Sequence, residues 1–359
     1  MNRILVIATR QIGDVLLTTP LVRAARQRWP QARIEVLGFA GTLGMLRGNP
    51  DIDALVETPA RLGWSGFWRL ARRLWRRYAL ALVTQPSDRA PLLAWMAARH
   101  RSGLLPARHG SNWWKRALLE HAVTSGGDES SQHAVAEKLE LLAPWREGVS
   151  AAEPARVVPP PASALPEDIE RQLQPGFVAI HAPSMWPYKQ WAPEKFRTVA
   201  QALLARGRQV VQTGSGGERD QACIAPLRDL APAPGLLDVS GRLDFAQLAG
   251  LLARAALYIG PDTSVSHLAA ASGVPVVAIF GPTNPQRWAP WPAQAEVPVR
   301  FQRRARAQSQ GNVTLLQAEL PCVPCSRAGC EDHVGSRSDC LLAITPERVI
   351  EAAERILAS

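Results

Sequence analysis

Polar residues with catalytic chemistry stand where short apolar runs end and helical patterns begin. The apolar run Ile4–Ala8 is followed by Gln11-Ile12-Gly13-Asp14 and then by a helical pattern. A glycine in such a turn lets the backbone approach a ligand closely, and the carboxylate of Asp14 can accept a proton from an attacking hydroxyl. Asp14 is also a favourable helix N-cap. The residues alone leave both roles open, general base and plain cap.

Three later turns carry groups that suit a phosphate. Lys189 lies in the loop after the apolar run Phe177–His181. A glycine-rich turn, Gly214-Ser215-Gly216-Gly217-Glu218, precedes another helix, and Asp262-Thr263-Ser264 opens a third. Backbone N–H groups at helix starts and in glycine-rich turns bind phosphate. Each signal is weak alone, because a loop lysine is usually solvated and the glycine turn lacks both the P-loop ending and the G-x-G-x-x-G spacing.

The elements that must position these residues follow a repeated pattern. Short apolar runs alternate with helical patterns, which predicts an α/β fold with parallel sheets. The runs that we expect to be strands are Ile4–Ala8, Ile34–Leu37, Ala54–Glu57, Leu80–Thr84, Phe177–His181, Gln209–Thr213, Leu236–Val239, Leu257–Gly260 and Val276–Phe280. The expected helices include Val15–Arg28, Gly66–Arg77, 193–206, 218–230, 244–254, 263–272 and Pro346–Ala358. Two doubly wound, Rossmann-like domains facing a cleft would result.

A stretch rich in proline and alanine, Ala151–Pro166, divides the two series. The expected division is an N-terminal domain of residues 1–155, a linker of residues 156–166 and a C-terminal domain of residues 167–345. A final helix, 346–359, would pack back across a domain, the N-terminal one being the candidate.

Length, charge and composition narrow the class of protein. The 359 residues, 47% of them apolar, suffice for two domains of ~100–200 residues each. No apolar run approaches the ~18 residues of a membrane span, and the N-terminus lacks the apolar region of a signal peptide, so we expect a cytoplasmic protein. The net charge of +10 favours anionic partners. Nucleic acid is not expected, because no zinc-finger or RNA-binding signature is present.

Four motifs, in order along the chain, together resemble glycosyltransferase family 9, the ADP-heptose:lipopolysaccharide heptosyltransferases. They are Gln11-Ile12-Gly13-Asp14-Val15 with Thr19-Pro20, Lys189-Gln190-Trp191, Asp262-Thr263-Ser264-Val265-Ser266-His267 and Phe280-Gly281-Pro282-Thr283. The resemblance implies a GT-B fold, with an acceptor-binding N-terminal domain and a donor-binding C-terminal domain. It implies inverting transfer of L-glycero-D-manno-heptose from ADP-heptose to the inner core of lipopolysaccharide, with no cofactor required for catalysis.

The resemblance also assigns roles to residues. It makes Asp14 the base and brings Lys189 to the diphosphate, and it gives Glu218 a ribose contact. The donor-binding set that it implies is Ser184, Lys189, Gly214, Glu218, Asp262, Thr263, Ser264 and His267, and the acceptor-binding set is Arg10 and Gly13. The sequence His181-Ala182-Pro183-Ser184 departs from the His-Pro-Gly common in the family, which leaves the contacts of Ser184 open.

Rival functions remain at this point. They are a family 9 transferase with a protein or another core sugar as acceptor, a nucleotide-sugar epimerase of similar architecture, and a non-catalytic carbohydrate-binding protein on this scaffold. Asp51-Ile52-Asp53 has the D-x-D form of metal-dependent transferases, but its position at the start of an expected strand favours a structural role.

Four cysteines, Cys322, Cys325, Cys330 and Cys340, crowd one segment near the C-terminus. Four thiolates could close a tetrahedral structural site for zinc or iron. The alternative is a set of reduced, unligated cysteines in a loop, and a catalytic role for a metal there is not expected.

The segment Gly63–Tyr78 combines apolar residues at helical spacing with arginines on its other side. Such a helix can simply cover a sheet, or it can rest on an anionic surface such as lipid A phosphates or the cytoplasmic face of the inner membrane. The partners that the resemblance implies are ADP-heptose and a lipid A–core acceptor, and the segment Gly63–Tyr78 adds an expected peripheral contact with the inner membrane.

Overall fold

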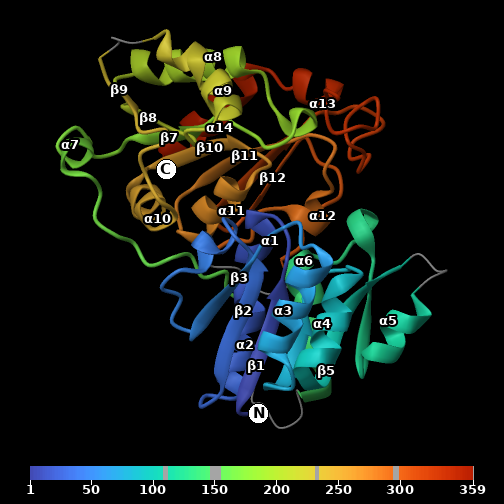
Figure 1. Cartoon of the computed structure of the whole chain (residues 1–359). Coiled ribbons are helices and arrows are strands. Elements are labelled where there is room, and N and C mark those ends of the chain that lie inside the picture. Colours follow the sequence, from blue (N-terminus) through green and yellow to red (C-terminus); the bar gives the residue numbers. More distant parts are fainter. Residues whose placement is uncertain (108–111, 146–154, 231–233, 294–298, 359) are drawn as a thin grey trace. The chain divides into compact units, whose positions relative to one another are not determined.

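The chain forms two compact units, Met1–Pro160 and Pro161–Ser359 (Figure 1). The structure, a computed structural model, describes residues 1–107, 112–145, 155–230, 234–293 and 299–358. The division between the units falls in the stretch rich in proline and alanine. Residues 151–154 of that stretch, and Ser359 of the final helix, lie outside the described residues.

The first unit contains a parallel sheet of order β3-β2-β1-β4-β5-β6. Its strands are β1 (Arg3–Ala8), β2 (Arg33–Phe39), β3 (Ala54–Thr58), β4 (Tyr78–Val83), β5 (Ala98–Pro106) and β6 (His121–Ser125). Its helices are α1 (Ile12–Leu16), α2 (Thr19–Arg28), α3 (Trp64–Leu74), α4 (Arg89–Ala97), α5 (Trp113–Leu118) and α6 (Ala134–Leu139), with short 3-10 helices η1 (Leu43–Leu46), η2 (Gly127–Glu129) and η3 (Glu140–Trp145). This alternation confirms the α/β class predicted for the first half of the chain.

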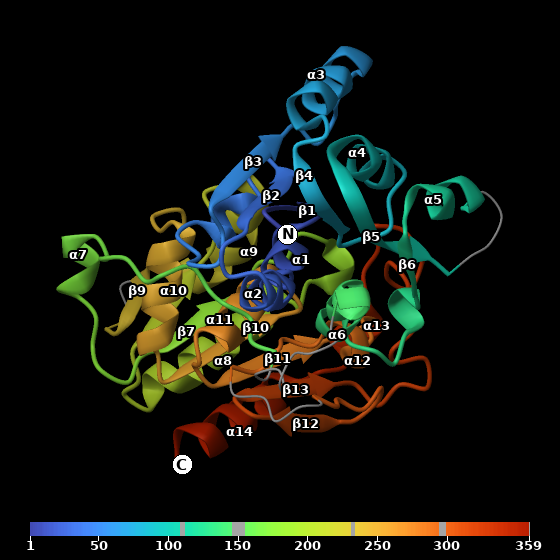
Figure 2. The same ribbon diagram turned by 90° about the horizontal axis from the view of Figure 1, so that it is seen from below.

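Helices cover both faces of this sheet (Figure 2). Leu5 and Ile7 of β1 point to a core that includes Phe67 of α3 and Leu93 of α4. The intervening residues of β1 point to the opposite core, which α1 and α2 complete. The strands are buried on both faces, and this is why they read as continuous apolar runs in the sequence.

The predicted helix Val15–Arg28 is broken in two. Pro20 cannot donate a backbone hydrogen bond and its ring clashes with the carbonyl four residues earlier, so the helix ends after Leu16 and restarts at Thr19. The hydroxyl of Thr19 donates to the carbonyl of Leu16 at 2.9 Å, which satisfies the acceptor that Pro20 leaves open. The break makes α1 a separate short helix that carries Asp14.

The second unit contains a sheet of order β12-β13-β11-β10-β7-β8-β9. Its strands are β7 (Val178–His181), β8 (Val210–Thr213), β9 (Leu236–Asp238), β10 (Leu257–Pro261), β11 (Val276–Phe280), β12 (Ala307–Gln310) and β13 (Val313–Gln317). Its helices are α7 (Glu167–Glu170), α8 (Pro193–Ala205), α9 (Glu218–Arg228), α10 (Phe245–Arg254), α11 (Ser264–Ala271), α12 (Pro285–Trp288), α13 (Asp339–Leu342) and α14 (Pro346–Leu357), with a 3-10 helix η4 (Pro187–Lys189).

The second unit has an antiparallel edge strand and ends in a helix that packs on its own core. The edge strand β12 pairs antiparallel with β13, whereas only parallel pairing was expected. The final helix α14 packs against α8, and its residues Val349 and Ala353 belong to the core of the second unit.

The segment that leads to α14 is anchored beside the end of β11. A Cβ atom placed on Gly281 would lie 2.7 Å from Cγ of Leu341, which is closer than carbon atoms approach one another. Leu341 is buried in the core. Glycine at this position therefore allows the segment before α14 to pack onto the turn after β11.

Gly281→Ala should lower the free energy of unfolding by about 1–3 kcal/mol, because the added methyl overpacks the site. Leu341→Ala alone should cost about 2–5 kcal/mol through the cavity it leaves. Because each change relieves the other, the double variant should cost clearly less than the sum. Urea unfolding of the four proteins measures this coupling, and strictly additive costs would show that the two residues do not press on each other.

Candidate functional site

Four strands of the second sheet end next to one another. The order β11-β10-β7-β8 is parallel throughout, so the turns after these strands emerge along one edge. They hold Gly281–Thr283, Asp262–Ser264, Ala182–Lys189 and Gly214–Gly217. Ligands of open α/β sheets bind at such an edge.

A buried ion pair joins two of these turns. Nζ of Lys189 lies 2.7 Å from Oδ2 of Asp262. Asp262 is only 6% exposed and also accepts a hydrogen bond from the side chain of Thr283, while His267 is close enough to interact with it electrostatically. The side chain of Lys189 keeps 24% of its surface exposed. The ammonium is thus held by a buried carboxylate at this edge of the sheet.

These neighbours determine the charge of Asp262. Burial alone would raise its pKa, but the charge of Lys189, the hydrogen bonds from Lys189 and Thr283, and the charge of His267 outweigh it. The pKa of Asp262 therefore lies below its ordinary value. Asp262 is a fixed anion that orients Lys189.

The loop carrying Lys189 is held by the residue that follows it. Oε1 of Gln190 accepts a bond from the backbone N–H of Ser184 at 2.8 Å, and its Nε2 donates to the carbonyls of Ala182 and Trp191 at 2.7 Å. The hydroxyl of Ser338 donates to the carbonyl of Tyr188 at 2.7 Å. Gln190 was part of a motif in the sequence, yet nothing there indicated that it spans the loop.

The turn after β10 presents the start of α11. Thr263 is the N-cap, with extended backbone (φ −146°, ψ 166°), and its side chain makes no capping hydrogen bond. Thr263 and Ser264 are half-buried, whereas His267 is buried. Because no side-chain cap occupies this helix start, its first N–H groups can serve a bound anion.

A tyrosine under this turn explains the glycine before it. Tyr258 is fully buried, and its hydroxyl lies 3.0 Å from Oγ of Ser266, which donates to the carbonyl of Pro261. A Cβ atom on Gly260 would lie 2.2 Å from the Tyr258 hydroxyl. The glycine therefore lets the tyrosine tie β10 to α11.

The glycine-rich turn after β8 lies beside the loop after β7. A Cβ atom on Gly214 would meet Ile224 at 2.3 Å and Pro183 at 3.4 Å. Nδ1 of His181 lies 3.0 Å from the hydroxyl of Thr213, which joins the ends of β7 and β8. Glu218 is exposed in the first turn of α9. The structure thus places Ser184, Gly214 and Glu218 on neighbouring turns of one edge.

Asp14 belongs to the first unit and is not a helix cap. The cap of α1 is Gln11, and Asp14 stands in the first turn, half-buried. The predicted capping role is wrong, because the helix begins two residues before Asp14. The carbonyl of Asp14 accepts bonds from Nζ of buried Lys138 at 2.8 Å and from the hydroxyl of Thr18 at 2.9 Å. Among the described residues, the carboxylate itself has no hydrogen bond or ion pair, so it is available for chemistry.

The two acceptor-side residues lie near Asp14 in sequence. Gly13 is part of α1 and half-buried, whereas Arg10 is exposed in the turn after β1. Nε2 of Gln85 donates to the hydroxyl of Thr9 at 2.8 Å, which fixes the end of β1 just before this turn. The contact between Lys138 and Asp14 spans 124 residues and had no signal in the sequence.

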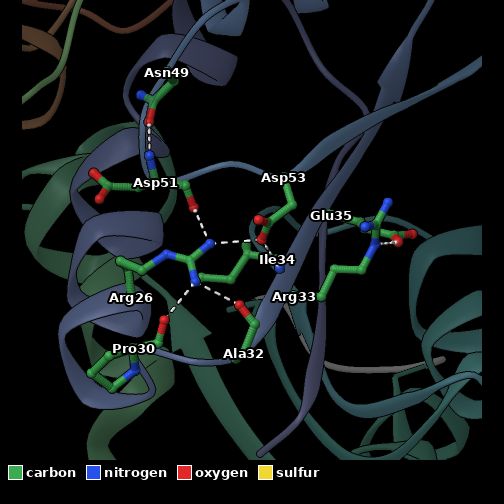
Figure 3. A network of polar contacts seen from close by, with 9 residues as sticks. All are labelled: Arg26, Pro30, Ala32, Arg33, Ile34, Glu35, Asn49, Asp51 and Asp53. Carbon is green, nitrogen blue, oxygen red and sulfur yellow. Dashed lines mark hydrogen bonds and ion pairs between the residues drawn. The ribbon is translucent and has the colours of Figure 1, made fainter.

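The D-x-D sequence is structural (Figure 3). The carboxylate of Asp53 accepts bonds from Nη2 of Arg26 and from the backbone N–H of Ile34, both at 2.6 Å. Burial would raise the pKa of Asp53, but these two bonds hold it below its ordinary value. Asp51 offers Arg26 its backbone carbonyl, and its carboxylate points away from that of Asp53. The two carboxylates therefore do not form a metal-binding pair.

The sequence left open whether the four cysteines bind a metal or remain unligated thiols. All are free thiols, and only Cys340 is buried. Burial, together with the nearby Cys325, Cys330 and Cys322, raises the pKa of Cys340 to about 12. In the part of the chain that the structure describes, no group of three or more His, Cys, Asp or Glu is arranged to hold an ion. Instead the segment supports the site: the N–H of Ser326 donates to the carbonyl of Pro282 at 2.8 Å.

The ion pair predicts how stability responds to acid. The pKa of Asp262 is lower in the folded protein than its unfolded value of about 3.9. The stabilisation is therefore fully present above that value and is lost as the pH falls through the folded pKa. Asp262→Asn should lower the free energy of unfolding by about 1–3 kcal/mol at neutral pH, and the difference from the wild type should shrink below about pH 4.

Urea unfolding at several pH values measures this difference. Asp229→Asn is the matched control, because Asp229 is an exposed carboxylate in the same unit and should change little. Equal stability of wild type and Asp262→Asn at neutral pH would contradict the assignment of the ion pair.

Known proteins resemble the chain in sequence over most of its length. Lipopolysaccharide heptosyltransferase 3 of Escherichia coli is 29% identical over 293 residues, which cover 78% of this chain and 83% of that protein. Lipopolysaccharide heptosyltransferase 1 of Pseudomonas aeruginosa is 26% identical, with 99% of this chain and 98% of that protein covered.

None of the described helices is long and apolar enough to cross a membrane.

Solved structures share the fold over nearly the whole chain. The family 9 glycosyl transferase of Veillonella parvula has a TM-score of 0.74 at 22% identity, covering 99% of this chain and 97% of its own. The ADP-heptose lipopolysaccharide heptosyltransferase II of Escherichia coli has a TM-score of 0.70 at 20% identity, covering 100% and 99%. The two sheets with their helices thus form a GT-B fold. Because the model of glycosyltransferase family 9 (heptosyltransferase) matches residues 67–316, the chain belongs to this family and is a glycosyltransferase.

Proposed function

We propose that this protein transfers L-glycero-D-manno-heptose from ADP-heptose to the inner core of lipopolysaccharide, with inversion at the anomeric carbon. The observation that carries the proposal is the ammonium of the partly exposed Lys189, fixed by the buried Asp262 at one edge of the second sheet. The uncapped start of α11 follows Asp262 directly. A cation and a helix start together suit a diphosphate.

The donor site in this proposal lies on the second unit. The diphosphate of ADP-heptose is bound by Lys189 and by the N–H groups at Thr263 and Ser264. Negative charge grows on the departing ADP, so these groups stabilise the transition state more than the bound donor. Glu218 binds the ribose, and Ser184, Gly214 and His267 complete the donor pocket. A solved structure titled as Escherichia coli heptosyltransferase WaaC with ADP has a TM-score of 0.72 to this chain, which agrees with an ADP leaving group.

The base in this proposal is Asp14. Inverting transfer requires a base that takes the proton of the acceptor hydroxyl as it attacks the face opposite the leaving group. The carboxylate of Asp14 has no partner among the described residues, and its backbone is fixed by Lys138 and Thr18. A free carboxylate on a fixed backbone suits a base. Gly13 and Arg10 bind the acceptor beside it.

Because the chain belongs to glycosyltransferase family 9, a nucleotide-sugar epimerase and a non-catalytic carbohydrate-binding protein are no longer candidates. A protein or another core sugar as acceptor remains the second candidate. The lipopolysaccharide acceptor is preferred because the curated relatives are named lipopolysaccharide and lipooligosaccharide heptosyltransferases. A lipid-linked acceptor implies that the protein works in the cytoplasm, at the surface of the inner membrane. Catalysis is proposed to need no metal, because Lys189 and the start of α11 take the place of a divalent cation.

Incubation with ADP-heptose and core acceptors truncated at successive sugars tests the proposal. Mass spectrometry of the products should show one added heptose on a single truncated acceptor, and EDTA should not abolish it. NMR of the new linkage should show inversion at the anomeric carbon. Transfer only to a protein acceptor, or only with another sugar nucleotide, would contradict it.

Lys189→Ala should weaken ADP binding about tenfold or more, because a charge-assisted contact of roughly 1.5–3 kcal/mol is lost. Turnover should fall further, since the charge on the leaving group grows in the transition state. Lys189→Arg should recover only part, because a planar guanidinium replaces a compact charge. Calorimetric titration with ADP checks this, with the exposed Arg171→Ala of the same unit as the control that loses one cation elsewhere. Unchanged ADP binding in Lys189→Ala would remove Lys189 from the donor site.

Asp14→Asn should lower turnover by about 10²–10⁴-fold with little change in donor affinity, because the amide cannot act as the base. The fold should be retained, since the cap of α1 is Gln11 rather than Asp14. Asp51→Asn is the matched control and should keep normal turnover. Steady-state rates with saturating donor measure the effect, and near-normal turnover in Asp14→Asn would mean that another group is the base.

A further inference from the structure

Exposed tryptophans and arginines gather on helices of the first unit. Trp64 is 77% exposed and Trp113 75% exposed, and Trp75 and Trp68 expose 50% and 41% of their surfaces. We use the name tryptophan–arginine face for these side chains and the exposed arginines beside them: Trp64, Trp68, Arg69, Arg72, Arg73, Trp75, Arg76, Trp113 and Arg116. They lie on α3, just after α3, and on α5.

The helices that carry this face lie on one side of the first sheet. Helix α4 contacts both α3 and α5, and Figure 2 shows the three helices following one another. All three connect strands that proceed in one direction across the sheet, so they cover the same face. The tryptophans and arginines of α3 and α5 therefore belong to one side of the unit.

The tryptophans of helix α3 lie outside its buried side. Its inner side already buries Phe67, Leu70 and Leu74. Trp64, Trp68 and Arg72 recur every four residues and so lie along another side of the helix. The rings of Trp64 and Trp68 contact each other, with centroids 5.8 Å apart. Large apolar rings that face solvent beside a completed core indicate a surface for a partner.

The same region holds an excess of positive charge, part of which is compensated because Arg101 pairs with Glu120. Residues 58–119 contain twelve lysines and arginines but one acidic residue, Asp88, whereas the whole chain has a net charge of +10. Asp88 is already paired with Lys115. None of the five arginines of the tryptophan–arginine face forms an ion pair within the described residues. The field of this side therefore attracts an extended anionic surface.

We propose that the tryptophan–arginine face docks onto an anionic phospholipid bilayer. Tryptophan rings favour the boundary between headgroups and acyl chains, and arginines beside them are attracted by anionic headgroups. The proposal rests on the proposed function, because a lipid-linked acceptor requires the enzyme to reach a bilayer. Beyond that function, the proposal identifies the tryptophan–arginine face as the surface that contacts the bilayer, and negatively charged lipids as those it selects.

Vesicle flotation tests the proposal on the full-length protein. The probes are vesicles of phosphatidylcholine alone and of phosphatidylcholine mixed with phosphatidylglycerol. The wild type should float with the mixed vesicles only, and binding should be lost at about 1 M salt, where the screening length falls to about 3 Å. Arg69→Gln/Arg72→Gln/Arg73→Gln should bind about 100-fold more weakly, because each arginine near an anionic surface contributes about fivefold.

Two further variants separate the aromatic contribution from net charge. Trp64→Ser/Trp68→Ser should weaken binding about tenfold while keeping its salt dependence, because the charges remain. Arg171→Gln/Arg206→Gln/Arg355→Gln removes the same charge from exposed positions of the second unit and should bind within about twofold of the wild type. Circular dichroism checks that each variant is folded.

Three results would overturn the proposal. They are failure of the wild type to bind the mixed vesicles, equal loss of binding in the two arginine variants, and tighter binding to a single-stranded oligonucleotide than to vesicles. Transfer to a delipidated core acceptor is measured in parallel and should be unchanged in every surface variant. Vesicle binding without any heptose transfer would refute the proposed function alone, whereas transfer without vesicle binding would refute the docking surface alone.

Discussion

The candidate site depends on one ion pair, that of Lys189 with the buried Asp262. A carboxylate removed from water is stable only with a cation and hydrogen bonds around it. Asp262 obtains these from the loop after β7, from Thr283 after β11, and from His267 on α11, the helix that follows it. The same contacts join three turns that the chain reaches at positions far apart. The requirement to stabilise one buried charge therefore fixes where the ammonium of Lys189 stands.

Lysine and arginine also occupy different kinds of position in this protein. Only four of the 41 lysines and arginines are lysines, and none of the four is exposed. Lys115 pairs with Asp88, Lys138 bonds the carbonyl of Asp14, Lys189 pairs with Asp262, and Lys195 bonds two carbonyls before α14. A compact ammonium fits where a single close contact in a confined space is needed, and a guanidinium fork does not. Arginine, apart from the buried Arg287, instead lies at or near the surface in the described part of the chain, where reach and permanent charge matter.

Much of the fold could be predicted because buried parallel strands read as apolar runs, and β1, β7, β10 and β11 lie close to the predicted positions. The strand β5 was missed because it begins with the charged residues Arg99 and Arg101, and β12 because it is a polar edge strand. Motif order indicated which turns carry the donor site that we propose. Contacts such as Lys138 to Asp14 could not be predicted, since they depend on tertiary packing rather than on local pattern. The cysteine spacing suggested a metal, whereas the segment supports the turn at Pro282 through its backbone.

In the proposed reaction, the diphosphate of the donor binds at the edge of the second sheet, against Lys189 and the start of α11. A crystal structure of the protein with ADP tests it most directly. We expect diphosphate oxygens within hydrogen-bond distance of Nζ of Lys189 and of the backbone N–H groups at Thr263 and Ser264, with Asp262 still paired to Lys189. A diphosphate bound at the glycine-rich turn Gly214–Gly217, with Lys189 making no contact to it, would contradict the account.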